Sequence, residues 1–178
     1  MRKIYKITAT HERIFTLARI LGIDPGLHRT GWGIVDYDGF HLKYVIHGVI
    51  IADPAQKIEI RLRHIYKMLS DVIEENSPTE VSIEQVFVNN NPLSSLKLGM
   101  ARGVAICVAS VMGLRVTEYT PNKIKKSVVG SGHATKDQVS IMVQKLLNCG
   151  SVKLDAADAL AIAICHAHHA TCYKMIIA

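Results

Sequence analysis

Four acidic residues lie where buried elements of the chain are expected to begin or end. Asp24 follows the apolar run 20–23 and precedes a Pro-Gly turn, and Glu84 lies within a second apolar run. Asp155 and Asp158 are three residues apart at the start of a helical pattern. A set of carboxylates without Cys or His favours Mg²⁺ or Mn²⁺ over zinc. Such a set also needs a cation, because two like charges at about 4 Å repel by roughly 4 kcal/mol at an effective dielectric constant near 20.

Each of these acids also has an ordinary structural explanation. Glu84 stands in the expected strand 80–88, where an edge-strand acid facing water and a paired or metal-bound acid are equally good interpretations. Taken alone, Asp155 and Asp158 favour helix capping, because the helix dipole stabilises acids in a first turn. The metal interpretation rests on the convergence of all four acids. Paired divalent ions about 4 Å apart activate water and stabilise both reacting oxygens in phosphodiester cleavage.

The charge balance favours a polyanionic partner. The chain has 21 basic and 15 acidic residues, a formal charge of +6, and assigning four acids to metal leaves 11 acids against the 21 bases. Basic residues gather in the segment 123–136, and its loop Gly130-Ser131-Gly132 could bring backbone N–H groups to a phosphate. The loop lacks the residue order of a nucleotide-binding loop, and a solvated basic surface is the simpler alternative.

Hydrophobic periodicity predicts the elements that must position the acids. Strand 20–24 carries Asp24 to a turn, and strands 30–37 and 42–51 follow, joined by the strong hairpin signal Asp38-Gly39. Three antiparallel strands result. A helix that ends at Ser77-Pro78 comes next, followed by strand 80–88. The apolar stripe of this helix consists of Ile58, Leu62, Ile65, Leu69 and Val72.

The segment 93–113 predicts a long helix rich in small residues, which suits a buried helix or a subunit interface. Its apolar stripe is formed by Leu96, Met100, Val104, Cys107 or Val108, and Val111.

Two shorter helices are expected between strand 115–119 and the final helix. Thr120 caps the first, ahead of a proline, and Thr135 with Gln138 forms a capping box for the second. The His-rich segment 165–169 near the end of the final helix is interpreted as a solvated end rather than a metal cluster.

Length and composition indicate one globular domain, since 178 residues with 49% hydrophobic content bury a substantial core. We expect a disordered basic extension over residues 1–18, or an upstream start codon, rather than an organelle-targeting leader. The folded domain is expected over 19–170 and a tail over 171–178. The longest uncharged apolar stretch, 103–114, is shorter than the roughly 20 residues of a spanning helix. The four cysteines lack C-x-x-C spacing, which favours reduced thiols.

Four motifs in this order make the chain similar to the RuvC family of bacterial Holliday-junction resolvases, from about residue 19 to about residue 168. The resemblance implies an α/β, ribonuclease-H-like fold with a five-stranded mixed sheet, three antiparallel strands and then two parallel. It implies a homodimeric, Mg²⁺-dependent endonuclease that nicks two opposing strands of a four-way DNA junction symmetrically during recombination and repair. It also implies a RuvA–RuvB partner complex and a bacterial cytoplasm. The motifs are Ile20-Leu21-Gly22-Ile23-Asp24-Pro25-Gly26 with Thr30-Gly31, Ile83-Glu84-Gln85-Val86-Phe87, Val128-Val129-Gly130 with Lys136, and Asp155-Ala156-Ala157-Asp158-Ala159-Leu160-Ala161.

The resemblance also implies roles for individual residues. The four acids match the family's ligands for two Mg²⁺ ions, for which Mn²⁺ is a substitute. Phe87 matches an aromatic residue that stacks on a base near the crossover, whereas a core position is its ordinary explanation. Lys125 and Lys136 match lysines near the scissile strand, and Lys125 is counted with the catalytic residues. Lys126 is expected to contact the DNA backbone.

Three alternatives stay open at this point. A nuclease of the same fold acting on RNA would use the same acids, and a junction-binding protein without catalysis would bind equally well after losing them. The turn 22–26 also resembles the phosphate loop of sugar-kinase and actin-like ATPases. Those proteins need two such domains, which 178 residues cannot hold.

Overall fold

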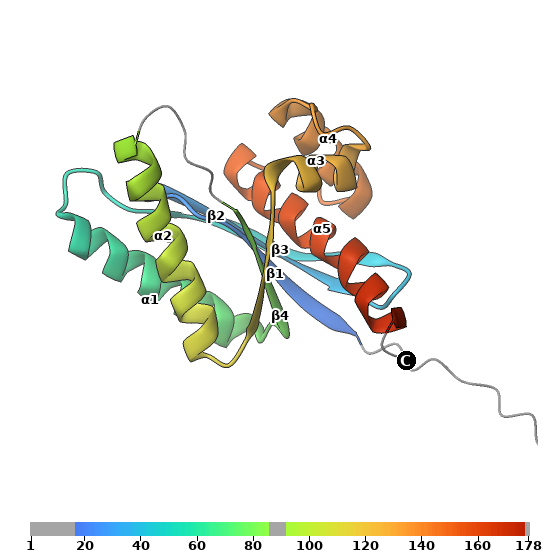
Figure 1. The fold of residues 1–178 in the computed structure, drawn as a ribbon, viewed down its shortest axis with the longest axis horizontal. Coiled ribbons are helices and arrows are strands. Elements are labelled where there is room, and N and C mark those ends of the chain that lie inside the picture. Colours follow the sequence, from blue (N-terminus) through green and yellow to red (C-terminus); the bar gives the residue numbers. More distant parts are fainter. Residues whose placement is uncertain (1–16, 86–91, 177–178) are drawn as a thin grey trace, which may run out of the picture.

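The computed structural model describes residues 17–85 and 92–176, with side chains up to His169. Phe87 and most of the expected basic extension lie outside the described residues. Ten elements follow one another along the chain (Figure 1). They are β1 (Ala18–Asp24), β2 (Arg29–Tyr37), β3 (Leu42–Ile51), α1 (Ile58–Asn76), β4 (Glu80–Glu84), α2 (Pro92–Val111), β5 (Arg115–Tyr119), α3 (Pro121–Val129), α4 (Lys136–Leu147) and α5 (Leu154–Ile176).

The sheet has the strand order β3-β2-β1-β4-β5. β1, β2 and β3 pair antiparallel, and β4 and β5 add in parallel beside β1. This is the predicted mixed sheet, and the fold class is confirmed. Parallel strands require crossovers, which α1 and α2 supply. The expected caps of the two short helices are also present, Thr120 at α3 and the Thr135–Gln138 capping box at α4.

Helices cover both faces of the sheet (Figure 1). α1 and α2 pack on one face, around a core that contains Leu21, Ile23 and Ile83. α3, α4 and α5 pack on the other face, around a core that contains Ile20 and Val35. Because side chains alternate along a strand, residues 20, 22 and 24 of β1 face α5, and residues 21 and 23 face α1 and α2.

Glycines in β1 and β2 allow α5 to lie directly on the strands. A Cβ added to Gly22 would come within 2.1 Å of the Ala159 carbonyl oxygen, and one added to Gly31 within 2.0 Å of the Asp155 carbonyl oxygen. Gly33 makes a similar contact with Leu160. No side chain fits at Gly22 or Gly31, because the obstacle there is the backbone of α5. Gly22, Gly31 and the alanines of α5 therefore set how closely its first turns approach the strand ends.

Two expectations about element bounds need correction. β4 ends at Glu84, with Gln85 outside it, whereas strand 80–88 was expected to contain this acid in its interior. Glu84 is therefore at a strand end, where a carboxylate keeps access to solvent. α5 extends to Ile176 and so continues into the expected tail 171–178.

The interpretation of segment 165–169 as a solvated end was wrong for its first three residues, since Ala167 is buried together with the two residues before it. Cys165 and His166 are buried, because α5 is still covered by the sheet at this point. One ring nitrogen of His166 lies 3.0 Å from Tyr119 Oη, and the other lies 2.7 Å from Glu80 Oε2. His166 thus connects α5 to two strands, as a satisfied core histidine does.

The apolar stripe expected on α2 forms the core only in part: Val108 is buried and Val104 packs against the core, but the remaining residues of the stripe do not. Ala101, Ala105, Val108 and Ala109 are the buried residues of this helix, while Leu96 is 57% exposed and Met100 is 37% exposed. Among the described residues, α2 is also the one helix long and apolar enough to cross a membrane by length and composition. Arg102 of α2 nevertheless forms an ion pair with Glu118 of β5, which ties the helix to the sheet.

Candidate active site

The strand register brings the acids of β1 and β4 to one edge of the sheet. Ile23 pairs with Ile83 in the parallel β1–β4 ladder, so Asp24 and Glu84 follow at adjacent strand ends. Both occupy positions that face α5. Asp24 also pairs with Gly31 of β2, and the Asp155 backbone lies against Gly31. The first turn of α5, with Asp155 and Asp158, therefore lies over the end of β1.

The electrostatics of Asp24 show how close the acids are. The pKa of Asp24 is raised to about 8, mainly by burial and also by the negative charges of Glu84, Asp158 and Asp155. The pKa of Glu84 is raised as well, first by burial and then by Asp158. Burial and the neighbouring negative charges thus favour the protonated form of both carboxyl groups, and a bound cation would favour the charged form.

Two cations compensate the acids of α5. Lys136, at the start of α4, donates a hydrogen bond from Nζ to Asp158 Oδ2 over 2.8 Å. This hydrogen bond raises the pKa of Lys136, with further contributions from Asp24 and Glu84. Arg29, at the start of β2, donates from Nε to Asp155 Oδ2 over 2.6 Å. In the described part of the chain, no comparable cation bonds Asp24 or Glu84.

The residues fit a divalent cation by their chemistry. All four donors are carboxylates, and two of them carry raised pKa values that a bound cation would lower again. No three His, Cys, Asp or Glu side chains of the described residues converge at metal-binding distance. One oxygen of each acid of α5, Oδ2 of Asp155 and Oδ2 of Asp158, is bonded to Arg29 or Lys136 instead.

The raised pKa of Asp24 predicts a pH-dependent stability of the metal-free protein. The pKa of Asp24 is 3.8 in the unfolded chain and about 8 in the folded protein. At a pH between these two values the folded state therefore binds one proton more than the unfolded state does. Stability is therefore lost as the pH rises from about 4 to about 8. We expect Asp24→Asn in EDTA to melt like the wild type near pH 4.5 and to be about 2 kcal/mol more stable at pH 8. Equal stability of the two proteins at both pH values would contradict this account.

The basic residues expected to contact DNA differ in their distance from the acids. Lys125 of α3 is partly exposed and lies close enough to lower the pKa of Glu84. Lys136 bonds Asp158 directly. Lys126 is exposed in the last turn of α3, and it is not among the charges that shift the pKa of Asp24 or Glu84. The structure thus brings Lys125 and Lys136 to the acids and leaves Lys126 at the periphery.

Sequence reasoning missed Arg29, which contacts the site as closely as Lys136 does. It opens β2, two residues before Gly31, on the strand face that α5 covers. A single arginine after a turn has no distinctive pattern. The available signal was its spacing, since residues 29, 31 and 33 share one face of the strand.

Comparisons with known proteins agree with this architecture. The profile of the family described as "Crossover junction endodeoxyribonuclease RuvC" matches residues 20–166. Crossover junction endodeoxyribonuclease RuvC of Gluconobacter oxydans is 48% identical over 163 residues, which cover 91% of this chain and 97% of that protein. The protein of the same name from Bordetella parapertussis is 51% identical over 84% of this chain and 83% of its own length.

Solved structures of Holliday junction resolvases also have this fold. "T. thermophilus RuvC in complex with Holliday junction substrate" superposes with a TM-score of 0.82 at 29% identity, covering 88% of this chain and 97% of that one. The yeast mitochondrial Holliday junction resolvase Ydc2 has a TM-score of 0.64 at 14% identity, over 94% of this chain and 89% of its own, which indicates a shared fold.

Proposed function

The chain belongs to the RuvC family of crossover junction endodeoxyribonucleases, and we propose from this premise how its residues serve a Holliday-junction resolvase. The enzyme cuts two opposing strands of a four-way DNA junction. The observation that carries the proposal is the gathering of four acids at one sheet edge, within the segment that the family profile matches. The net charge of +6 favours a polyanionic substrate.

For the metal centre, we propose that Asp24, Glu84, Asp155 and Asp158 hold divalent ions. Mg²⁺ is the expected ion, with two ions in each site and Mn²⁺ as a substitute, because these ions prefer carboxylate oxygens. Such ions supply the positive charge that makes water nucleophilic and stabilises the oxygens at the reacting phosphorus. The raised pKa values of Asp24 and Glu84 support this proposal, since both acids lack a bonded cation among the described residues.

The lysines complete the proposed site. Lys136 positions Asp158 through its hydrogen bond and adds positive charge beside the four acids. Lys125 faces Glu84, and a cation at this place stabilises negative charge that develops on a phosphate. We propose that Lys125 acts in catalysis and that Lys126, at the periphery, contacts the DNA backbone. Phe87 is proposed to stack on a base near the crossover, two residues after the described end of this segment.

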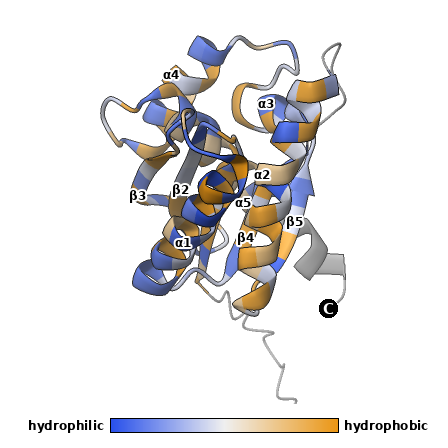
Figure 2. Cartoon of the chain, turned by 90° about the vertical axis from the view of Figure 1, so that its left-hand side faces the viewer, coloured by the Kyte–Doolittle hydropathy of each residue, from blue (hydrophilic) through white to orange (hydrophobic). Residues whose placement is uncertain are grey.

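A homodimer would place two equivalent sites on the two strands to be cut. The exposed face of α2 supports this interface, because a mostly exposed helix with this much apolar surface marks an interaction site. In Figure 2, orange residues recur along α2, which lies toward the viewer. A Cβ at Gly99 or Gly103 would meet no atom within 4 Å, so another helix can approach closely there. The exposed apolar residues of α2 are Leu93, Leu96, Met100 and Val111.

Met100→Lys is expected to convert the dimer to a monomer. A charge placed in an apolar interface loses its hydration without a partner, which costs several kcal/mol in the dimer and little in the monomer. Sedimentation velocity should show the molar mass falling by about half at micromolar protein. Ile141→Lys, on the exposed side of α4, is the matched control. A dimeric Met100→Lys would place the interface elsewhere.

Two further parts of the function follow from family membership as proposals. The enzyme is proposed to cooperate with a RuvA–RuvB branch-migration complex and to work in the bacterial cytoplasm, where chromosomal recombination and repair take place. The relatives from Gluconobacter oxydans and Bordetella parapertussis are bacterial, which supports this assignment.

A labelled synthetic four-way junction tests the proposed function. We expect paired symmetric nicks on the junction in Mg²⁺, no nicks in EDTA, and no comparable cutting of a duplex of the same sequence. Preferential cutting of an RNA–DNA hybrid would move the chain to an RNA-directed nuclease. Junction binding without cutting in any divalent metal would leave a binding protein.

A further inference from the structure

We propose that Arg29 and Lys153 form a binding site for a backbone phosphate of the DNA, and that Arg29 connects this site to the metal centre by holding Asp155. The inference rests on the proposed junction-cleaving function. The site is a pocket beside the four acids. Arg29 and Lys153 are not among the residues to which the family resemblance assigns a role.

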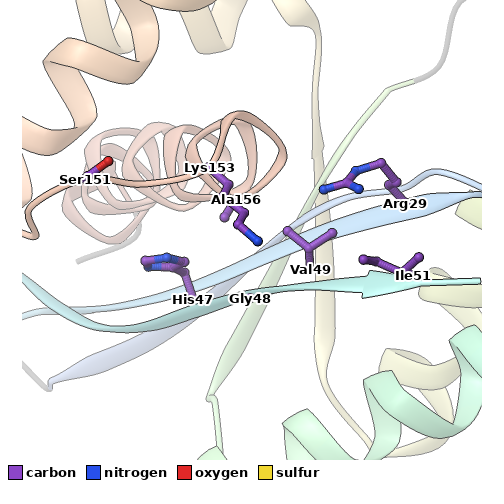
Figure 3. A pocket seen from close by; sticks show the side chains of 8 residues that line it. All are labelled: Arg29, His47, Gly48, Val49, Ile51, Ser151, Lys153 and Ala156. Atoms are coloured by element: carbon purple, nitrogen blue, oxygen red, sulfur yellow. The ribbon is translucent and has the colours of Figure 1, made fainter.

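The pocket lies between strands β2 and β3 and the loop that leads into α5 (Figure 3). Its volume is about 320 Å³, within the range of pockets that hold small ligands. Among the described residues, none of those that line it is acidic. The lining residues are Arg29, His47, Gly48, Val49, Ile51, Ser151, Lys153 and Ala156.

Two cations point into this pocket from opposite sides. Figure 3 shows the nitrogen-bearing ends of Arg29 and Lys153 extending toward the same space beside Val49. The Arg29 guanidinium uses Nε for Asp155, and within the described part of the chain its Nη groups and Lys153 Nζ bond no other residue. Unused N–H groups of an arginine fork match the oxygens of a phosphate, and a nearby lysine adds a point charge.

The start of α5 adds to the positive potential. Ala156 lines the pocket from the first turn of this 23-residue helix, where backbone N–H groups lack intrahelical acceptors and the helix dipole is positive. Ser151 is a further polar lining residue. A helix start and two cations around one concave space favour a phosphate over an uncharged ligand.

The contact between Arg29 and Asp155 couples the two sites. The guanidinium that faces the pocket also holds Asp155 Oδ2, with Nε at 2.6 Å. This hydrogen bond fixes the orientation of the Asp155 carboxylate and leaves Oδ1 available for a metal ion. Gly31 fixes the Asp155 backbone from below. A phosphate in the pocket would anchor the strand next to the acids while Arg29 keeps Asp155 in place. Arg29 is therefore a positioning residue for Asp155 and a binding residue for DNA.

Fluorescence anisotropy with a four-way junction in EDTA tests the DNA contact without metal. Lys153→Gln should weaken binding by about five- to tenfold and lower the slope of log K against log salt by about 1. Lys67→Gln, an exposed lysine of α1 on the opposite face, is the matched control and should leave both unchanged. Unchanged affinity and slope for Lys153→Gln would overturn the proposal.

A walk of single neutral methylphosphonates along the strand near the cut locates the phosphate. At one position the substitution should weaken wild-type binding and have a clearly smaller effect on Lys153→Gln, in which only Arg29 still faces this phosphate. If every methylphosphonate weakens binding by the same factor in Lys153→Gln as in the wild type, the assignment is overturned. If the wild type binds the junction no better than duplex, the proposed function itself fails. A wild type that prefers the junction while Lys153→Gln behaves identically refutes the pocket alone.

Mn²⁺ binding to the DNA-free protein, followed by calorimetry, separates the two roles of Arg29. Arg29→Gln should weaken Mn²⁺ binding by about tenfold, the size of effect typical for partners of metal ligands, while Lys153→Gln leaves it unchanged. Arg29→Lys should restore part of the junction affinity and little of the Mn²⁺ affinity, because a point charge lacks the planar fork. Wild-type Mn²⁺ affinity in Arg29→Gln would overturn the positioning role.

Discussion

Asp155→Asn is expected to lower the rate of junction cleavage by roughly a thousandfold or more while junction binding is retained. The change removes one negative charge from a centre that we propose to hold divalent ions, and a thousandfold corresponds to about 4 kcal/mol of transition-state stabilisation. Asparagine keeps the size of the side chain, and its amide oxygen still accepts a hydrogen bond from Arg29. Lost folding is therefore a poor explanation for lost activity in this variant.

Single-turnover cleavage of a labelled junction in Mg²⁺ measures this effect, with anisotropy in EDTA as the measure of binding. Asp137→Asn is the matched control, because Asp137 is an exposed acid in the first turn of the neighbouring helix α4. It should cut at the wild-type rate. A variant at Asp155 that still cuts within a few fold of the wild type would remove this acid from the proposed metal centre.

Gly22→Ala is expected to cost about 3 kcal/mol or more in the free energy of unfolding, which is roughly 6–12 °C in Tm for a chain of this size. The added Cβ would come within 2.1 Å of the Ala159 carbonyl oxygen and 2.7 Å of the Ala163 backbone nitrogen. Both are backbone atoms of α5 and cannot rotate away. The helix must lift from β1, which also opens the core around Leu160 and Ile164.

Thermal melting at a fixed protein concentration in EDTA measures this loss. Gly132→Ala is the control, because a Cβ there would meet its nearest atom at 3.6 Å, an ordinary contact, and its Tm should change by no more than about 1 °C. Equal Tm values for the two variants would show that α5 does not lie on β1 as closely as described.

Local signals in the sequence determined most of the fold. Alternating apolar residues, the Asp38-Gly39 turn and the caps at Thr120 and Thr135 act over a few residues, and the structure bears them out. Membership in the family could also be recognised, because four short motifs occur in the expected order. The same motifs singled out the four acids, although Glu84 was expected inside a strand and not at its end.

Only the tertiary structure decided which faces of these elements are covered and which side chains meet. The stripe of α2 was indistinguishable from a core stripe, since periodicity shows that a helix has an apolar face and not what covers it. His166 was expected at a solvated end, yet the sheet extends far enough to bury it.

Arg29 and Asp155 illustrate the same limit within the site. They are 126 residues apart, and their contact depends on the strand register and on the glycines that admit α5. The residues next to Arg29 or Asp155 in the sequence do not predict this contact. Contacts between distant segments are set by packing of the whole core, and this is the part of the site that the sequence alone did not determine.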